Sequence, residues 1–269
     1  MYLSLWTTHI GQVTFEDETE PYREILGDPT KEDAVLAFLK KERIESLSLY
    51  DLYKILGDAT REPALLSFIT RARQNGVLEV NAIGDTTYAA WDAIATTQAA
   101  SKPFDGLVTE IEFWNGSATF QEFTDTLKYV RSLNIPGRTG GEATLGVYTG
   151  WPDATQIEGM LPLIDRLYVH VYVKSPDLAY GYGKDRFQLI ANANQKLGTN
   201  VDVRPIFSAE GVAWSAGSEH FMGDWLSTGS LDEAEAQLLG AWEAVPPIGP
   251  VKETGFQYYD YFFLNRYVK

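Results

Sequence analysis

The chain has 269 residues, of which 45% are hydrophobic and 13% aromatic, and its formal net charge at pH 7 is −15. This composition is that of a well-packed globular protein. The strong negative charge, without any basic run, argues against nucleic acids and anionic membrane surfaces as partners. The absence of cysteine excludes disulfides, thiolate nucleophiles and cysteine metal sites. Neutral ligands such as sugars are compatible with all of these features.

The sequence carries no apolar run of the length that a membrane span needs. The first residues also lack the basic and then apolar regions of a signal peptide. The compartment is therefore open, and a secreted or periplasmic location is favoured if a leader ahead of Met1 has been removed. The sequence does not determine the oligomeric state.

Strand and helix patterns alternate along the whole chain. Short runs with period-2 alternation or continuous apolar character predict strands at 2–8, 46–50, 77–83, 104–114, 144–149, 166–173, 201–207 and 255–263. Apolar residues at spacings of three and four predict helices at 31–43, 63–75, 87–100, 117–133, 155–164, 184–197 and 232–243. No stretch reads as a linker between domains.

Eight strand–helix units in a chain of this length predict one (β/α)8 TIM-barrel domain over residues 1–269. The structural alternative is a doubly wound open sheet. That fold usually has a glycine-rich phosphate turn after its first strand. Here the first strand runs into Thr7-Thr8-His9-Ile10-Gly11, so the barrel is favoured.

Two carboxylates lie two residues apart in the expected fourth strand. Because side chains alternate along a strand, Glu110 and Glu112 share one face with Val108, and apolar residues occupy the other face. Buried carboxylates are costly unless they are paired or functional. In a lone strand they read equally well as a solvated acidic edge, whereas in a barrel they point to a site at the carboxyl ends of the strands.

The same alternation directs further polar and aromatic side chains to the inside of the barrel. They are Trp6, Tyr50, Asn81, Tyr168, His170, Tyr172, Arg204, Tyr258 and Asp260. Trp114 and Trp151 fall at strand ends, where flat rings suit the apolar faces of sugars. Together these residues predict a glycan-binding site, and we expect Arg204 to pair with Glu110 or Asp260.

The segment from Asp105 to Glu112 resembles the fourth-strand signature Asp-Gly-x-Asp-x-Asp-x-Glu of glycoside hydrolase family 18, the chitinases and endo-β-N-acetylglucosaminidases. Residues 78–85 and the stretch that ends at Tyr172 are similar to the family's third-strand and sixth-strand segments. The resemblance implies that Glu112 is the general acid that protonates the glycosidic oxygen. It also implies that Glu110 orients the acetamido group, whose oxygen is the nucleophile, and that Tyr172 holds the acetamide.

The sequence departs from the family's pattern at four places. Glu110 is one methylene longer than the aspartate expected there. Val108 and Val173 stand where the family has aspartates, and the eighth strand has no evident tryptophan. Three hypotheses follow. The first is a glycoside hydrolase acting on an N-acetylhexosamine-containing glycan, with Glu112 as general acid/base. The second is a carbohydrate-binding pseudo-enzyme of the same fold, and the third is an unrelated barrel hydrolase or lyase that uses His170 with the carboxylates.

No cofactor is expected from the sequence. A metal site is not expected either, because the three histidines form no His-x-His or His-Glu-x-x-His spacing. A serine nucleophile lacks support as well, since no Gly-x-Ser-x-Gly motif is present.

Overall fold

The computed structural model describes residues 2–5, 25–50, 52–209, 220–259, 261 and 265, with only the backbone described for 2–5. The chain forms two compact units. The first unit comprises Met1–Thr109 and Tyr129–Thr144, and the second comprises Glu110–Lys128 and Leu145–Lys269.

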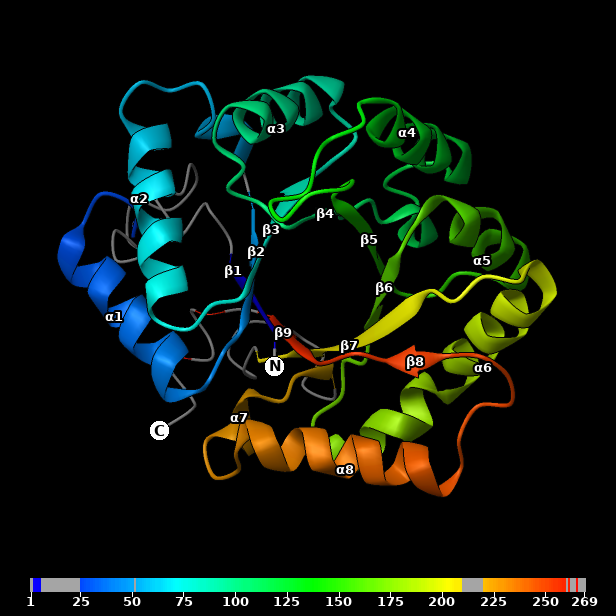
Figure 1. The fold of residues 1–269 in the computed structure, drawn as a ribbon. Coiled ribbons are helices and arrows are strands. Elements are labelled where there is room, and N and C mark those ends of the chain that lie inside the picture. Colours follow the sequence, from blue (N-terminus) through cyan, green and yellow to red (C-terminus); the bar gives the residue numbers. More distant parts are fainter. Residues whose placement is uncertain are drawn as a thin grey trace. The chain divides into compact units, whose positions relative to one another are not determined.

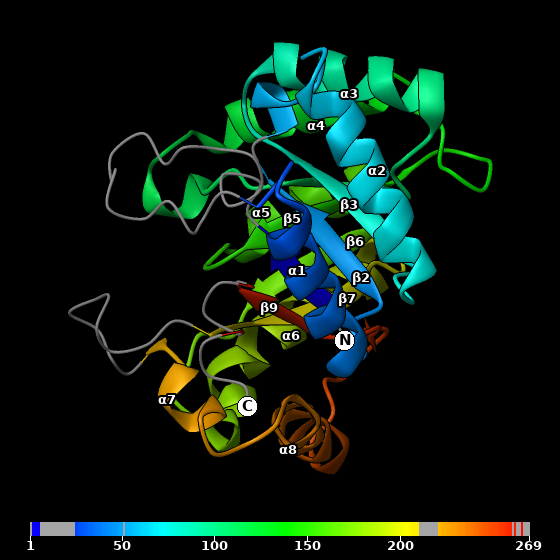
Figure 2. The same cartoon turned by 90° about the vertical axis from the view of Figure 1, so that its left-hand side faces the viewer.

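The first unit contains four parallel strands that pair in chain order (Figure 1). They are β1 (Tyr2–Leu5), β2 (Ser46–Leu49), β3 (Glu79–Gly84) and β4 (Gly106–Thr109). The helices that follow the first three strands are α1 (Pro29–Lys41), α2 (Arg61–Gln74) and α3 (Tyr88–Ser101). Asp28 caps α1 by accepting from the backbone N–H groups of Thr30 and Lys31. Figure 2 shows α1 and α2 packed side by side.

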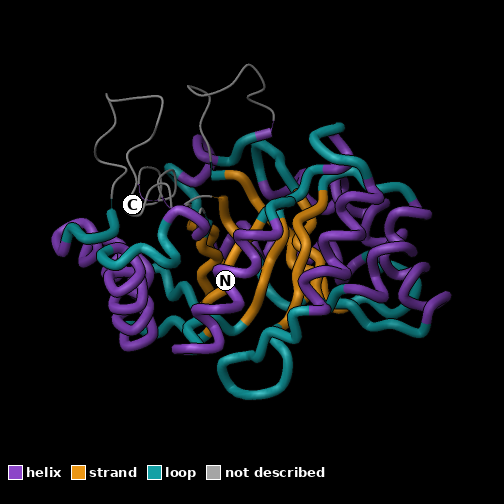
Figure 3. Tube along the Cα trace, turned by 90° about the horizontal axis from the view of Figure 1, so that it is seen from above, coloured by secondary structure: helices purple, strands orange, loops and turns teal. Residues whose placement is uncertain are grey.

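The second unit continues the same alternation. Its strands are β5 (Thr144–Thr149, which begins at the last residue of the first unit), β6 (Arg166–His170), β7 (Asp202–Ser208), β8 (Lys252–Glu253) and β9 (Gln257–Tyr259). Its helices are α5 (Ala154–Met160), α6 (Ala179–Leu197), α7 (Gly223–Leu226) and α8 (Leu231–Ala244), whereas α4 (Phe120–Ser132) begins in the second unit and ends in the first. Figure 3 marks the strands in orange and the helices in purple along the trace.

Parallel pairing runs from β5 to β6 and from β6 to β7, and both β8 and β9 pair in parallel with β7. Since β8 lies against the start of β7 and β9 against its end, the two short strands together occupy the eighth strand position. The alternation of eight parallel strand positions with helices is the (β/α)8 TIM-barrel fold, as predicted.

The core of the second unit lies between β6 and α6. Leu167 and Val169 are fully buried, as are Phe187 and Ile190 of the helix. Because successive side chains of a strand point to opposite faces, this packing turns Tyr168 to the other side of the sheet. The apolar packing of alternate residues thus directs the polar and aromatic residues of β6 away from the helices.

The fourth strand is shorter than the sequence predicts. β4 ends at Thr109, and Phe113–Asn115 forms a turn of 3-10 helix that ends at Gly116, whose φ is +86°. The segment with both carboxylates, Glu110 and Glu112, therefore follows the strand and does not belong to it. The side chains of Glu110 and Glu112 therefore lie in the turn after the strand and not on a face of the sheet.

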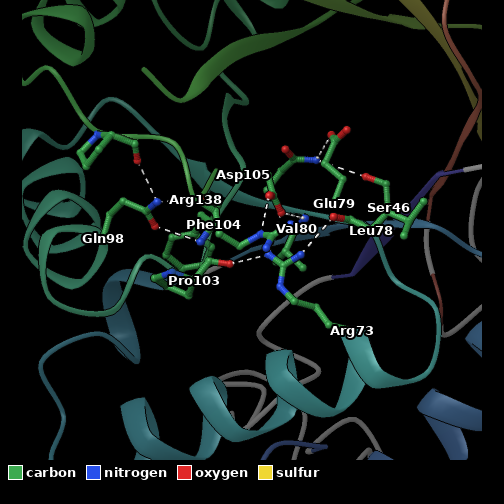
Figure 4. A network of polar contacts seen from close by, with 12 residues as sticks. Ser46, Arg73, Leu78, Glu79, Val80, Gln98, Pro103, Phe104, Asp105 and Arg138 are labelled. Carbon is green, nitrogen blue, oxygen red and sulfur yellow. Dashed lines mark hydrogen bonds and ion pairs between the residues drawn. The ribbon is translucent and has the colours of Figure 1, made fainter. Parts of the chain in front are cut away.

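Asp105 ties the amino end of β4 to its surroundings (Figure 4). Its Oδ2 accepts from Nη2 of Arg73 at 2.6 Å and from the backbone N–H of Val80 at 2.9 Å, and its Oδ1 accepts from Nε of Arg138 at 2.8 Å. Arg73 reaches Asp105 from α2 and also donates to the carbonyl of Pro103 at 2.8 Å. The first aspartate of the family-18-like segment therefore has a structural role, at the opposite end of β4 from Glu110.

Candidate functional site

An aromatic cluster in the second unit joins the turn after β4 to the end of β6. The rings of Trp114 and His170 meet edge to face, with centroids 5.6 Å apart, and His170 stacks on Tyr172 at 4.6 Å with an interplanar angle of 7°. Gly150, directly after β5, leaves room for the indole of Trp114, because a Cβ there would collide with it. The turn that carries Glu112 is thereby held against the carboxyl ends of β5 and β6.

The two carboxylates of this turn are half-buried. Asn115 donates from Nδ2 to Oε2 of Glu112, and the hydroxyl of Ser117 donates to the backbone carbonyl of Glu112 at 2.9 Å. The backbone N–H of Ser117 in turn donates to Oδ1 of Asn115 at 3.0 Å, which fixes the amide. The turn thus holds the side chain of Glu112 in one orientation while leaving it partly open to solvent, as a group that exchanges protons with a ligand requires.

Arg186 of α6 is a buried side chain of the same region, with 3% exposure. Its Nη1 donates to the backbone carbonyls of Gly150 at 2.8 Å and of His170 at 2.5 Å, and its Nη2 donates to the carbonyl of Tyr182 at 3.0 Å. The guanidinium lies 4.3 Å from the ring of Trp151 and 4.8 Å from the ring of Tyr182. One cation therefore contacts the ends of β5 and β6 and two aromatic rings.

Tyr182 and Arg186 were missed by reasoning from the sequence. They lie four residues apart in the first two turns of α6, so they share one face of the helix. The start of a helix in a (β/α)8 fold lies at the same end as the carboxyl ends of the strands. An aromatic residue and an arginine with this spacing, directly after the sixth strand, would have been the signal.

His170 is neutral at physiological pH. Burial first, and the nearby charge of Arg186 second, lower the pKa of His170 from 6.5 to about 3. The neutral ring is free to stack on Tyr172 without bringing a second positive charge beside Arg186. Because the imidazole is neutral near pH 7, it has no imidazolium proton to give up, which disfavours His170 as the proton donor in the third hypothesis.

This lowered pKa makes a prediction for solution. In a histidine NMR titration we expect the ring of His170 to stay neutral from about pH 8 down to about pH 5. The unfolded chain protonates this histidine near pH 6.5 and the folded chain near pH 3. The free energy of unfolding therefore decreases as the pH falls from 6.5 to about 3. In His170→Gln this dependence of the free energy of unfolding on pH should be weaker by up to about 1.4 kcal/mol per pH unit, because glutamine does not titrate. Titration of His170 near its ordinary pKa would refute the prediction.

The other inward residues of β6 and β7 lie one layer toward the amino ends of the strands. Arg204 pairs in register with Tyr168 and donates from Nη1 to its hydroxyl at 3.3 Å. Its Nε donates to Oγ1 of Thr254 at 3.4 Å. These contacts place Arg204 deeper than His170. Of its two expected partners, Asp260 lies outside the described residues, and the pairing with Glu110 stays a prediction.

The eighth strand position differs from the prediction by one residue. Tyr258 was expected to face the inside, but its hydroxyl donates to the carbonyl of Leu231 at 3.1 Å and to Oε1 of Glu235 at 3.2 Å, both in α8. Its neighbour Gln257 instead donates to the hydroxyl of Tyr148. A shift of one residue exchanges the two faces of a strand, so Gln257 takes the inward place that the sequence assigned to Tyr258.

Glu235, the partner of Tyr258, has an unusual pKa. Burial is the largest cause that raises the pKa of Glu235 from 4.5 to about 7. The folded chain therefore binds this proton more tightly than the unfolded chain, and stability falls as pH rises from 4.5 through 7. Glu235→Gln, which keeps an acceptor for Tyr258, should raise Tm more at about pH 8 than at about pH 5. Equal gains at both pH values, measured by thermal unfolding, would contradict this.

Two predicted residues belong to the first unit. Asn81 is buried and donates from Nδ2 to Oγ of Ser46 at 3.3 Å and to Oε1 of Glu79 at 2.8 Å. It pairs in register with Gly106, at the amino end of β4, which favours a structural role over ligand binding. Tyr50 directly follows β2 and is also buried.

The remaining predicted residues have different outcomes. Trp6 and Asp260 lie outside the described residues. Trp151, in contrast, is 58% exposed directly after Gly150.

Within the described ranges, no three histidine, aspartate or glutamate side chains gather where they would hold a metal ion. No helix of those ranges is long and apolar enough to cross a membrane.

Comparison with known proteins identifies the fold. No protein-family model and no curated protein matches the chain. Solved structures do: a GH5_18 protein from Streptomyces cattleya in complex with GlcNAc is 12% identical with a TM-score of 0.58, and the match covers 96% of this chain and 70% of that one. A GH113 β-mannanase from Alicyclobacillus acidocaldarius is 11% identical with a TM-score of 0.53, over 96% and 86% of the two chains.

A third similar structure is a xylanase and alpha-amylase inhibitor protein from Scadoxus multiflorus. It is 14% identical with a TM-score of 0.52, and the match covers 99% of this chain and 95% of that chain. The chain has the fold of the glycoside hydrolase barrels. The neighbours belong to several glycoside hydrolase families, so the comparisons do not single out family 18 as the sequence segment did.

Proposed function

We propose that this protein is a glycoside hydrolase that acts on an N-acetylhexosamine-containing glycan, with Glu112 as its general acid/base. The observation that carries the proposal is the turn after β4, which presents the carboxylate of Glu112 two residues before Trp114 and fixes Trp114 against His170. Glycoside hydrolysis needs a carboxylic acid beside the leaving oxygen. Aromatic rings next to that acid suit the apolar face of a sugar.

Glu110 and Tyr172 complete the proposed site. Glu110 precedes Glu112 by two residues and is half-buried like it, which suits a carboxylate that orients a substrate group. Tyr172 stacks on the neutral ring of His170, so its phenol is held at the end of β6. The family-18-like segment assigns Glu110 to the acetamido group, and the similar sixth-strand stretch assigns Tyr172 to it. The GlcNAc complex of the GH5_18 neighbour agrees with an amino-sugar ligand for this fold.

The proposal is tested by a screen of aryl N-acetylglucosaminides and aryl chitobiosides with the wild type and with Glu112→Gln. We expect release of the aryl group by the wild type and a strong loss in the variant. Activity that survives the substitution unchanged would refute Glu112 as the acid. Activity that a chelator abolishes would instead support the hydrolase or lyase that uses His170 with the carboxylates.

A second candidate function is carbohydrate or protein binding without catalysis. Val108 replaces the aspartate that precedes Glu110 in the family-18 segment, which removes a partner able to share a proton with Glu110. The match with the xylanase and alpha-amylase inhibitor protein covers nearly the whole chain, which supports a binding function for this fold. Binding of chitobiose by the wild type and by Glu112→Gln, with no turnover in either, would favour this function.

A further inference from the structure

Arg186 is a buried cation that interacts electrostatically with the neighbouring carboxylate of Asp185. In the part of the chain that the structure describes, no carboxylate forms an ion pair with it, and its hydrogen-bond partners are backbone carbonyls. Its Nε is buried without a hydrogen-bond partner. Burial of a cation is costly when no ion pair compensates it, and here burial lowers the pKa of Arg186 to about 10 although the charge of Asp185 acts in the opposite direction. Three backbone carbonyls accept from its guanidinium in place of an ion-pair partner.

The contacts of Arg186 show what the cation does. One nitrogen, Nη1, joins the carbonyl of Gly150 after β5 to the carbonyl of His170 at the end of β6. These carbonyls belong to segments that carry the rings of Trp151 and His170. The guanidinium thus fixes the spacing of two strand ends where the proposed site lies.

The same guanidinium lies against the rings of Trp151 and Tyr182, which themselves meet edge to face at 5.1 Å. A cation over an aromatic face is attracted to it, more strongly when both are shielded from water. Trp151 is nevertheless 58% exposed, so the part of its surface not covered by these contacts meets solvent. A large exposed ring fixed from behind is preorganised for stacking, because little conformational freedom is lost when a ligand binds.

We propose that Arg186 is a positioning residue that fixes Trp151 as a stacking surface for a second sugar ring, so that the ligand is a chain of at least two sugars. The proposal rests on the proposed function for the glycan and adds the length of the ligand. Trp114, beside Glu112, contacts His170, whereas Trp151 contacts Arg186 and Tyr182. The site therefore has two separate aromatic surfaces, one for the sugar at the acid and one for its neighbour.

Calorimetric binding of N-acetylglucosamine, chitobiose and chitotetraose tests the proposal. We compare the wild type with Trp151→Ala and Arg186→Met, and use Trp242→Ala as the matched control. Trp242 packs on Phe187 and Tyr180 and belongs to neither aromatic surface. In the wild type and the control, affinity should rise from the monosaccharide to the tetrasaccharide. Trp151→Ala and Arg186→Met should bind the tetrasaccharide with about tenfold lower affinity than the wild type, whereas their affinity for the monosaccharide should be unchanged.

The decisive measurement is the ratio of the affinities for the tetrasaccharide and the monosaccharide. General destabilisation of the fold would weaken the binding of all three sugars alike and leave this ratio unchanged. If Arg186→Met does not fold, Arg186→Lys takes its place, since lysine keeps the charge but lacks the planar group that stacks on Trp151. An unchanged gain in Trp151→Ala or in the Arg186 variant would overturn the proposal while leaving the proposed hydrolase intact.

Two further outcomes separate this proposal from the proposed function. A chain-length gain that depends on Trp151 and Arg186, without hydrolysis of any aryl glycoside, would refute the hydrolase and support the second sugar position. Failure of the wild type to bind any of the three sugars would overturn the second sugar position for this ligand class.

Discussion

Replacing Glu112 by glutamine is expected to lower kcat for aryl N-acetylglucosaminides by about 10²–10⁴-fold, the usual contribution of a positioned general acid. Glutamine keeps the size of the side chain and an oxygen that can accept from Asn115, but it has no proton to transfer to the leaving oxygen. The fold should therefore be preserved, and the loss should appear in kcat more than in KM.

The leaving group offers an internal check on this prediction. A phenol of low pKa needs little protonation as it departs, so the loss in Glu112→Gln should be smaller for dinitrophenyl than for phenyl glycosides. Glu122→Gln is the matched control, because Glu122 is exposed in the first turn of α4 and its carboxylate accepts from the backbone N–H and the hydroxyl of Thr119. Equal rates for Glu112→Gln and Glu122→Gln would remove Glu112 from the mechanism.

Asp105→Ala is expected to lower the free energy of unfolding by about 3 kcal/mol, since two arginines lose their common carboxylate and a backbone N–H loses its acceptor. Asp105 and Arg73 are both mostly buried, with side-chain exposures of 18% and 19%, so water restores only part of what is lost. Urea unfolding with an unchanged m-value would measure the effect.

The matched control for this variant is Asp125→Ala. Asp125 forms an exposed ion pair with Lys128 at 3.2 Å, and an exposed pair contributes only about 0–1 kcal/mol.

At a temperature where Asp105→Ala is folded, the gain in its glycan affinity with the length of the sugar chain should equal that of the wild type. A loss of glycan affinity in the folded variant would assign Asp105 to the site and contradict its structural role.

The repeating pattern of strands and helices was predictable because it depends on local periodicity and local stop signals. β5 occupies Thr144–Thr149 as predicted, and α6 ends at Gly198, whose φ of +68° favours glycine. The end of β4 was not predictable in the same way. Apolar alternation continues through Phe113, yet the chain leaves the sheet after Thr109 and turns.

The inward face of the eighth strand also depended on tertiary contacts. Gln257 and Tyr258 are adjacent, and either side chain can be buried once its polar atoms have partners. The choice was made by α8, where Leu231 and Glu235 accept the hydroxyl of Tyr258. The sequence of this strand does not predict which side chain faces inward, because large side chains with polar atoms occupy successive positions and so lie on both faces.

The sequence by itself determined the (β/α)8 fold and singled out the carboxylates of Glu110 and Glu112, because hydrophobic periodicity and a short local segment are sufficient for both. It placed these carboxylates inside the fourth strand, whereas the structure has them after its end. Only the tertiary structure brings Arg186 to the carboxyl ends of β5 and β6. Its partners are the carbonyls of Gly150 and His170, 36 and 16 residues away, and a backbone carbonyl has no side chain that a sequence pattern can reveal. The stacking of Trp151 on that guanidinium is likewise a contact between distant segments, which folding alone brings together.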